Sequence, residues 1–543
     1  MSDHDPDRAG SSSGLLRSSV LVAAGTGLSR VTGLLRIMAI AYALGTRVLA
    51  DAYNLANTTP NVVYDLVLGG ILAATLVPVI VDRNEHGDRS GVDALATVVT
   101  VALVAVTVLA TAASPLIIRL YTVDLPAEEA QRQASLAVPL LVMFMPQVLF
   151  YGLTTLWTAL LNARRSFAVP AFAPVLNNVV VIALFLALPR LAGGKPTLEQ
   201  VRDDTGLLVL VGIGTTAGIV AMTLVLWPAM RRAGIRLRWN PDWRNPAVST
   251  VARLSGWTLG YVAANQVVFF AVLTLANGTG EGAVSAYTYA WLFVQLPYGL
   301  FTVSIMTTFT PELATHASRG DLPAFRSRFA QGLRLGLLVI LPAAAAYLVL
   351  ATPIVGFLLQ RGSFTEASTE LTASALVWFA AGLPGFAVFL YTMRGFYAFR
   401  DTRSPFLLNL CENVLQVGLA VVLVRRFGLP GVIAAFALAY SAAAVAALAV
   451  LARRAGPVGV DGLWAAVVRQ GVAAASMVAV MVVVTRVVTP GGSGEYVTQA
   501  LVGGAAGALT YLGVLALVRS DDLRALRALG ARIGARPDST TMP

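Results

Sequence analysis

The sequence predicts an all-α integral membrane protein with about 14 transmembrane helices, in two six-helix lobes related by a parallel repeat plus two C-terminal helices. Of its 543 residues, 57% are hydrophobic and only 12% are charged. Apolar stretches of about 20 residues, the length that crosses a bilayer as a helix, recur along nearly the whole chain. Two further observations, an alternation of basic and non-basic loops and an internal repeat, predict the orientation and the division into lobes.

Composition also argues against several classes of function. The single cysteine, Cys411, rules out an intramolecular disulfide, and the three histidines (His4, His86, His316) fall in the tail or in loops. The membrane interior therefore lacks the usual general bases and metal ligands. A net charge of +11 suits the basic loops of a membrane protein, so we expect no nucleic-acid partner. No nucleophile–base pair or catalytic pair of carboxylates is evident, so we do not expect an enzyme.

In chain order, the polar Ser/Gly-rich residues 1–14 predict a disordered cytoplasmic tail. We expect an N-lobe of helices TM1–6 over residues 15–245, a C-lobe of TM7–12 over 246–455, extra helices TM13–14 over 456–518, and a basic cytoplasmic tail over 519–543. The spans are expected to start near Leu16, Asn61, Val92, Leu136, Val169, Leu207, Ala247, Val284, Leu333, Leu371, Phe406, Pro430, Trp464 and Val497.

Alternate loops differ in basic charge, which predicts that both termini are cytoplasmic and that the protein is multi-pass. The loops of one set carry Arg83/Arg89, Arg164/Arg165, Arg231/Arg232/Arg236/Arg238/Arg244, Arg319/Arg326/Arg328, Arg400/Arg403 and Arg453/Arg454. The other set carries fewer basic residues and several acids, with Arg425 and Arg426 as the exception.

An internal repeat relates the two halves of the chain. The segment LNARRSFAVPAFAPVLNN at Leu161 is echoed by YAFRDTRSPFLLNLCENV at Tyr397, and DAYNLANTTPN at Asp51 by SAYTYAWLFVQLPY at Ser285. The offsets are about 234 to 238 residues, a constancy that is typical of a duplicated unit. Such repeats favour alternating access, in which two bundles rock around a site at the membrane midplane.

Arg30 and Arg36 lie within the first apolar run, where unpaired charge is rare and usually faces a cavity. Their spacing of six residues places them roughly 120° apart on a straight helix, and Gly27 and Gly33 would permit a bend toward one chamber. Arginine suits phosphate because its planar fork donates two parallel hydrogen bonds. The alternative for Arg36 is snorkelling or an ion pair with a nearby acid, Asp51 or Asp65.

Three polar residues follow on the next helix. Asp65 is either a transport residue or the partner of a first-helix arginine in a structural salt bridge. Asp51 lies at an interfacial bend, which favours a helix cap or a loop anchor. Asn61, at the start of the same span, completes the group that we expect around the substrate. Arg253, in the seventh span, faces either the central cavity or the cytoplasmic interface.

Asn409 and Asn413 are four residues apart and therefore share one face of the eleventh span, next to Glu412. Buried carboxamides usually bond across helices. Together with Asn265 they would alternatively offer oxygen ligands to a small cation such as Na⁺. No acidic spacing of a dedicated metal loop accompanies them, so we predict no metal site.

Several motifs in the same order resemble the lipid II flippase family (MurJ, also called MviN), within the superfamily of multidrug (MATE), oligosaccharidyl-lipid and polysaccharide exporters. The resemblance covers nearly the whole chain. Its motifs are SRVTGLLR at Ser29, DAYNLANTTPNVVYDLVLGG at Asp51, LNARRSFAVPAFAPVLNN at Leu161, RGSFT at Arg361 and GFYAFRDTRSP at Gly395.

The resemblance implies a two-lobed fold of 14 helices in the bacterial inner (plasma) membrane. By motif, first-helix arginines important in the family match Arg30 and Arg36, and an acid after that helix matches Asp51. Where other members carry further cavity cations, this chain has Tyr64 and Asp65, and about Leu292, so its chamber is less positive. It is similar to the actinobacterial branch.

The function that the resemblance implies is to flip lipid II, the undecaprenyl-pyrophosphate-linked peptidoglycan precursor, from the inner to the outer leaflet by alternating access. No cofactor is expected, and Na⁺, H⁺ or the membrane potential would drive the cycle. Membrane lipids are further expected partners, and cell-wall synthesis and division proteins are an open class. The alternatives are a flippase for another polyprenyl-linked glycan, a MATE-like exporter, and a non-transporting scaffold for cell-wall synthesis.

Overall fold

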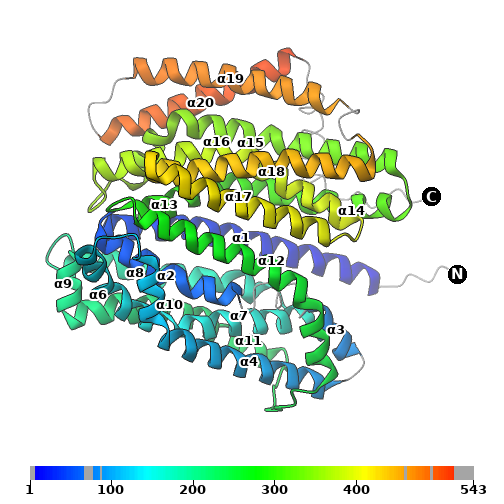
Figure 1. Cartoon of the computed structure of the whole chain (residues 1–543). Helices are drawn as coiled ribbons and strands as arrows, with labels where there is room; N and C mark the ends of the chain where they lie inside the picture. The colour runs from blue at the N-terminus through cyan, green and yellow to red at the C-terminus, as the bar shows by residue number, and fades with distance from the viewer. Residues whose placement is uncertain (1–6, 67–76, 86–87, 458–461, 489–492, 519–543) are drawn as a thin grey trace. The chain divides into compact units, whose positions relative to one another are not determined.

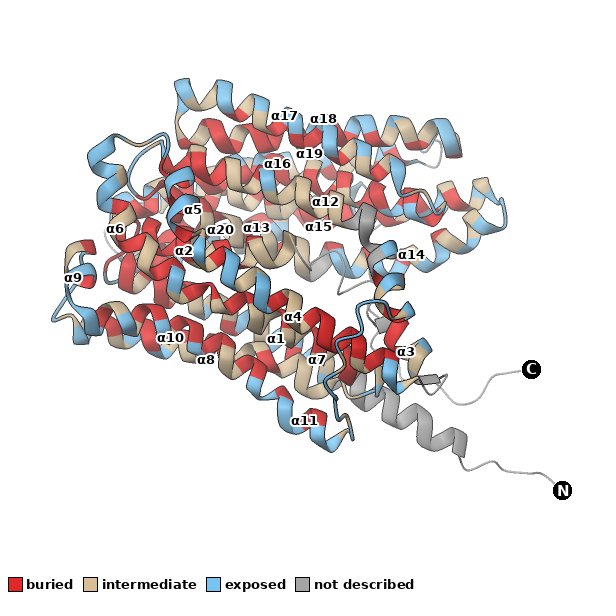
Figure 2. Ribbon diagram, turned by 60° about the horizontal axis from the view of Figure 1, so that its bottom comes forward, coloured by how far each residue is buried: buried red, intermediate tan, exposed pale blue. Residues whose placement is uncertain are grey.

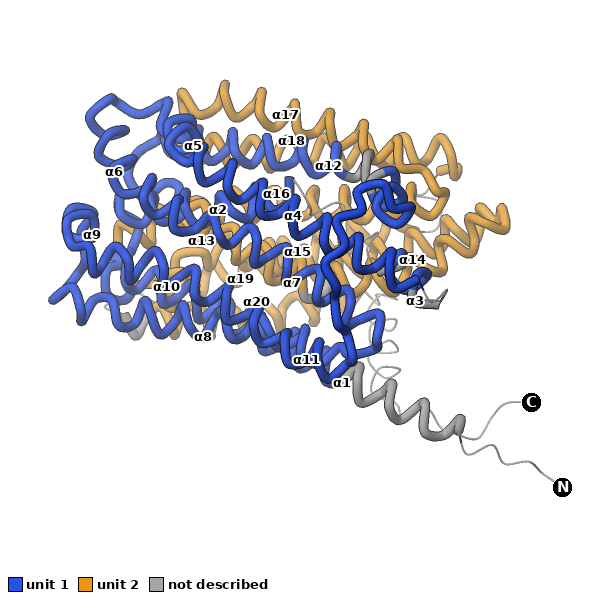
Figure 3. Tube along the Cα trace, turned by 90° about the horizontal axis from the view of Figure 1, so that it is seen from below, with its two compact units in different colours: residues 1–285, 361–365 blue, residues 286–360, 366–543 orange. Residues whose placement is uncertain are grey.

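The computed structural model describes residues 7–66, 77–85, 88–457, 462–488 and 493–518, which form helices and loops without a strand. The chain divides into two compact units (Figure 3). Unit 1 comprises Met1–Ser285 and Arg361–Thr365, and unit 2 comprises Ala286–Gln360 and Glu366–Pro543. The expected all-α membrane fold is confirmed.

Unit 1 is a bundle in which α1 packs along α8, α8 along α10, and α2 against α6 and α7 (Figure 1). Helix α12 packs in the same unit, against α4 and α5. The helices of this unit are α1 (Asp7–Leu44), α2 (Val48–Tyr64), α3 (Val77–Glu85), α4 (Arg89–Ala112), α5 (Ser114–Tyr121), α6 (Ala127–Phe144), α7 (Pro146–Ala163), α8 (Ala168–Leu191), α9 (Leu198–Asp203), α10 (Thr205–Leu224), α11 (Leu226–Arg232) and α12 (Pro246–Asn277).

Unit 2 is a second bundle in which α18 packs against both α16 and α17, and α15 packs against α16, α19 and α20. It comprises most of α13 (Ala283–Pro297), a π-helical turn (Tyr298–Thr302), α14 (Val303–Ser318), α15 (Leu322–Leu359), α16 (Glu366–Ala398), α17 (Arg403–Phe427), α18 (Leu429–Ala455), α19 (Leu463–Val487) and α20 (Ser493–Leu517).

Local chemistry fixes many of the helix starts. The carboxylate of Asp204 accepts the backbone N–H groups of Gly206 and Leu207, and Asn245 accepts that of Ala247. Proline stands in the first turn of α5, α7, α12, α15 and α18, where its missing N–H leaves no hydrogen bond unmade. Pinned ends of this kind hold the connecting loops in place.

Twelve described helices are long and apolar enough to cross a membrane, compared with about 14 expected. Two expected spans account for the difference. The span near Asn61 is α2, which has 17 residues, and residues 67–76 beyond it lie outside the described part. The span near Val284 is divided, because a π-helical turn at Tyr298–Thr302 separates α13 from α14.

The structure describes part of the expected N-terminal tail, residues 1–14, and none of the expected C-terminal tail, residues 519–543. Helix α1 already begins at Asp7, so residues 7–14 continue into the first helix instead of forming part of a separate tail. No proline interrupts this stretch, and the helix propagates from the apolar run that follows. Residues 1–6 and the basic tail 519–543 lie outside the described residues.

Helix α17 has the inverted polarity of a membrane helix. Its buried face carries Asn409, Glu412, Asn413 and Gln416, while Val414 and Val422 on the opposite face are each 67% exposed (Figure 2). In water an apolar face exposed over several turns would be unfavourable, whereas in lipid it is the stable arrangement. The polar face therefore packs inward, against α18.

The repeat is visible in the backbone as well as in the sequence. At the end of α7, Ser166 N–H bonds to Leu161 O, and Arg165 adopts a φ of 57°. At the end of α16, Asp401 N–H bonds to Phe396 O, and Arg400 adopts a φ of 56°. Both helices thus end in the same cap with a left-handed residue, 235 positions apart.

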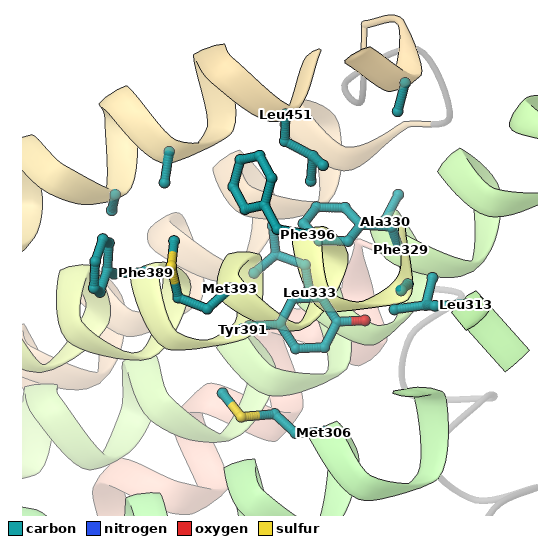
Figure 4. Packing of buried hydrophobic residues seen from close by; sticks show 14 of the residues in the cluster. Met306, Leu313, Phe329, Ala330, Leu333, Phe389, Tyr391, Met393, Phe396 and Leu451 are labelled. Atoms are coloured by element: carbon teal, nitrogen blue, oxygen red, sulfur yellow. The ribbon is translucent and has the colours of Figure 1, made fainter. Parts of the chain in front are cut away.

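Aromatic packing forms the core of unit 2 next to this second cap. Phe329 on α15 packs against Tyr391 on α16 with ring centroids 5.1 Å apart, and Phe396 lies beside them (Figure 4). Leu451 on α18 closes the same cluster. The core holds α15, α16 and α18 together at the end of the unit where the arginine-rich loops begin.

Candidate functional site

The first helix holds one arginine in the interior of unit 1 and the other on its surface. Arg30 is exposed, whereas Arg36 is half-buried. The Nε atom of Arg36 is buried and has no hydrogen-bond partner in the described part of the chain. A buried cationic donor without an acceptor is costly, so this guanidinium is well suited to receive an anion.

Tyr151 on α7 lies near three of the predicted site residues. It lies within the electrostatic reach of Arg36 and of Asp65, and its hydroxyl is close to the carboxamide of Asn61. Arg36 also reaches Tyr53 on α2. Tyr151 therefore has the carboxamide of Asn61 beside its hydroxyl and the charges of Arg36 and Asp65 in its wider surroundings, in a half-buried polar region of unit 1.

Asp65 has a neutral partner. Its Oδ2 accepts a hydrogen bond of 2.8 Å from Gln266 Nε2 on α12, and no ion pair joins it to either first-helix arginine among the described residues. The salt-bridge alternative is thus not realised in this structure. The neighbouring hydroxyl of Tyr64 bonds to Thr155 Oγ1 at 2.7 Å. The acid is thus bonded to one uncharged polar group, and a second uncharged polar pair lies at the residue before it.

Sequence reasoning missed Tyr151, Thr155 and Gln266. Their helices, α7 and α12, are apolar enough that single polar residues give little signal against the background of spans. The structure marks this region in both halves of the chain, because regular α-helix geometry is lost at Asp65 and at its counterpart in the repeat, Gly299. Such π-helical turns are frequent at functional sites.

Asp51 caps a helix start, as its position in a bend predicted. Its carboxylate, 2% exposed, accepts hydrogen bonds from the backbone N–H of Gly282 (2.6 Å) and from the N–H and Oγ of Ser285 (2.8 and 2.7 Å). In return, Glu281 Oε1 accepts the N–H of Val48 at 3.2 Å. The first turns of α2 and α13 therefore cap one another, with acids at positive helix ends.

Two loops of unit 1, one that contains Thr46 and one that contains Ser363, pack beside these caps. Gly282 has a φ of 84°, and a Cβ at this position would collide with the carbonyl oxygen of Thr46. Ser363, within the RGSFT motif, donates its N–H to Tyr42 O at 2.8 Å. A cavity of about 210 Å³ beside them is lined by Asp51 and Glu281 among other residues. The end of unit 1 opposite the arginine-rich loops is thus tightly bonded.

The remaining charged candidate lies apart from this region. Arg253 is exposed near the start of α12. Arg394, a further intramembrane arginine, is exposed on α16 and lies within electrostatic reach of Tyr298 and Tyr397.

The carboxamides divide between the two units. Asn413 Nδ2 donates to Asn409 Oδ1 at 3.4 Å, and both residues are buried on α17 beside Glu412, which is 1% exposed. Asn265 belongs to unit 1, where its Nδ2 donates to Tyr261 O on its own helix. Among the described residues no group of three His, Cys, Asp or Glu side chains could hold a metal ion.

Comparison with known proteins gives one consistent result. The family model described as lipid II flippase MurJ matches residues 40–502. A lipid II flippase MurJ of Burkholderia cenocepacia is 30% identical over 402 residues, which cover 72% of this chain and 75% of the relative.

Solved structures show the same fold. A lipid II flippase MurJ in an inward closed conformation superposes with a TM-score of 0.74 at 20% identity, covering 92% of this chain and 99% of that one. A multidrug transporter of the MATE family, in an inward-facing conformation, superposes with a TM-score of 0.65 at 17% identity, covering 79% and 95%. At these identities the likeness concerns the fold.

Proposed function

Because the chain belongs to the lipid II flippase MurJ family, we propose that it moves lipid II from the inner to the outer leaflet of the bacterial inner membrane. The observation that carries this proposal is the family match over residues 40–502. The step is transport by alternating access and involves no covalent chemistry. Lipid II, an undecaprenyl-pyrophosphate-linked precursor, and membrane lipids are the partners.

The pyrophosphate is the part of lipid II that the half-buried cation would bind. Arg36 offers a guanidinium whose Nε is buried without an acceptor, and phosphate oxygens satisfy such a donor with charge-assisted hydrogen bonds. Arg30, exposed six residues earlier on α1, would meet the anion on its way to Arg36. Asn61 and Asp65 would contact the polar part of the substrate through the region around Tyr151.

The mutual caps of α2 and α13 would serve as the gate at the end of unit 1 away from the arginine-rich loops. Release of substrate at that end requires that Gly282 and Ser285 separate from Asp51. Hydrogen bonds to a charged acceptor each contribute about 1.5–3 kcal/mol, so this end stays closed until binding energy compensates for their loss.

We propose a cytoplasmic location for the arginine-rich loops and for both termini, as the distribution of basic residues favours. An inside-negative potential then assists outward movement of the anionic headgroup by about 2.3 kcal/mol per charge per 100 mV. A gradient of Na⁺ or H⁺ is the alternative driving force, with Asn409 and Asn413 as the cation-binding candidates.

Transport by purified protein tests the proposal. Full-length protein in liposomes should translocate a fluorescent lipid II analogue, measured by quenching of the analogue in the outer leaflet. Equal translocation by protein-free liposomes would refute transport. Translocation of a different polyprenyl-linked glycan but not of lipid II would favour the second candidate, a flippase for another substrate in the same superfamily.

A further inference from the structure

A cationic cavity lies at the arginine-rich end of unit 1, formed by residues that the proposed transport site does not use. Its volume is about 320 Å³, at the lower end of the range for small-molecule sites. Four arginines line it: Arg89, Arg164, Arg236 and Arg238. Asp93 is the one acid in its lining.

The cavity is built by a loop that is hydrogen-bonded to a helix far away in sequence. The backbone N–H of Arg238 donates to Asp93 Oδ1 at 3.1 Å, and the N–H of Asn240 donates to Thr97 Oγ1 at 3.0 Å. The side chain of Asn240 also bonds to Ser90. The loop after α11 is thus fixed on the first turns of α4, and its backbone beside Arg236 and Arg238 is held in place before any ligand arrives.

The charge in the cavity indicates the class of ligand. No ion pair neutralises any of the four guanidiniums within the described residues, and the carboxylate of Asp93 is engaged by a backbone N–H. Converging arginines bind phosphate groups through paired N–H donors. The buried side chains of Val92 and Leu160 add an apolar wall. A ligand that matches this lining is an anion that carries a phosphate next to an apolar part.

The position of the cavity distinguishes a lipid from a soluble phosphate. Arg89 begins one candidate membrane span, Arg164 follows the end of another, and the loop with Arg236 and Arg238 follows a third that ends at Arg232. The same loop carries Trp239 and Trp243, which are 70% and 55% exposed. Exposed tryptophan beside the ends of spans is typical of the headgroup layer of a membrane.

We propose that this cavity binds the phosphate of an anionic phospholipid headgroup in the leaflet that faces the arginine-rich loops. Phosphatidylglycerol represents this class of ligand. The site is distinct from the region around Arg36, so the proposal stands or falls independently of lipid II transport.

Binding of a short-chain lipid to the full-length purified protein in detergent tests this proposal. Dioctanoyl phosphatidylglycerol should bind more tightly than dioctanoyl phosphatidylcholine, and Arg236→Gln/Arg238→Gln should weaken its binding roughly tenfold or more, because each basic residue near an anionic headgroup contributes a several-fold factor. Arg231→Gln/Arg232→Gln removes the same charge outside the cavity and should have a much smaller effect. Arg164→Gln, in a different loop, gives an independent variant if the double variant fails to fold.

A further variant tests the geometry without changing any charge. Thr97→Val removes the acceptor for Asn240 and should weaken phosphatidylglycerol binding while all four arginines remain. An equal loss in the cavity and control double variants would overturn the proposal in favour of a general basic surface. Inorganic phosphate that competes at the same concentration as the lipid would overturn the lipid assignment, and so would equal binding of the two lipids.

Discussion

The carboxylate of Asp51 accepts two hydrogen bonds from Ser285, one from its backbone N–H at 2.8 Å and one from its Oγ at 2.7 Å. The two residues are 234 positions apart and occupy equivalent places in the internal repeat, since Tyr53 and Tyr287 follow them with the same spacing. The first turns of two equivalent helices, α2 in the first half of the chain and α13 in the second, thus meet in this contact. In the proposed transport cycle this contact is the gate that opens for release of the substrate.

Replacement of Asp51 by asparagine should weaken that contact. The amide has one acceptor oxygen and no charge, so it cannot accept from Gly282 and Ser285 with both oxygens as the carboxylate does. We expect Asp51→Asn to lower the free energy of unfolding by about 2–4 kcal/mol and to impair complementation of a depleted strain. Thermal unfolding in detergent and growth of the complemented strain measure the two effects.

Asp124→Asn, a change at another loop of unit 1, is the matched control and should complement fully. Wild-type unfolding temperature and growth for Asp51→Asn would contradict the importance of the caps.

Replacement of Arg36 by glutamine should separate function from stability. The guanidinium has a buried Nε without a partner, so its removal should leave the unfolding temperature unchanged or raise it slightly. Loss of the proposed contact to pyrophosphate should nevertheless abolish complementation, and Arg30→Ala should have the same effect on function. Membrane levels of each variant must be measured alongside growth.

Arg119→Gln changes an exposed arginine on α5 and serves as the control. Full rescue by Arg36→Gln would show that Arg36 is not needed to bind the substrate.

The proposed cation site on α17 can be tested by the effect of sodium on the unfolding temperature. Purified wild-type protein should unfold at a higher temperature in NaCl than in choline chloride, because a ligand that binds only the native state stabilises it. Asn413→Ala should abolish this difference, since it removes one of two buried carboxamides that lie in contact. An equal sodium response in both proteins would leave the two asparagines with a structural function only.

Asp401, in the loop between α16 and α17, should make the stability of the protein depend on pH. Burial opposes the charge of Asp401, but hydrogen bonds from Ser404 and the nearby charge of Arg454 outweigh it and hold the pKa of Asp401 below its ordinary value. Arg454 Nη1 lies 2.6 Å from the carboxylate. A depressed pKa stabilises the native state fully above the ordinary carboxyl pKa of about 3.9, and the stabilisation is lost as pH falls through the lower native value.

Asp401→Asn should therefore unfold at a lower temperature than wild type at pH 7, and the difference should shrink as the pH approaches 3. Asp203→Asn breaks a fully exposed ion pair and should change the unfolding temperature little. A difference between Asp401→Asn and wild type that stays constant with pH would contradict the ionic origin of the effect.

The fold was largely predictable because membrane spans and a duplicated unit leave strong sequence signals. The echo of Leu161 in Tyr397 is reflected in two identical helix caps, with Arg165 and Arg400 both left-handed. The division of the eighth span was not predictable, since hydropathy does not register a π-helical turn at Tyr298–Thr302.

The candidate site was predictable only in part. Buried charge gives a clear signal, which indicated Arg36 and the cap residue Asp51. The partner of Asp65 could not be predicted, because Gln266 is 201 residues away and one polar residue among many on a long helix. The cavity of four arginines was also hidden, since its residues come from the start of α4, the end of α7 and the loop after α11, which only the folded chain brings together.

Leaflet-resolved measurement of lipid II in cells depleted of this protein shows whether the protein transports lipid II. We expect outer-leaflet lipid II to fall and inner-leaflet lipid II to accumulate, and wild-type protein, but not Arg36→Gln at equal membrane level, to restore the distribution. Unchanged outer-leaflet lipid II in the depleted cells, with cell-wall enzymes lost from division sites, would contradict transport and favour a scaffold.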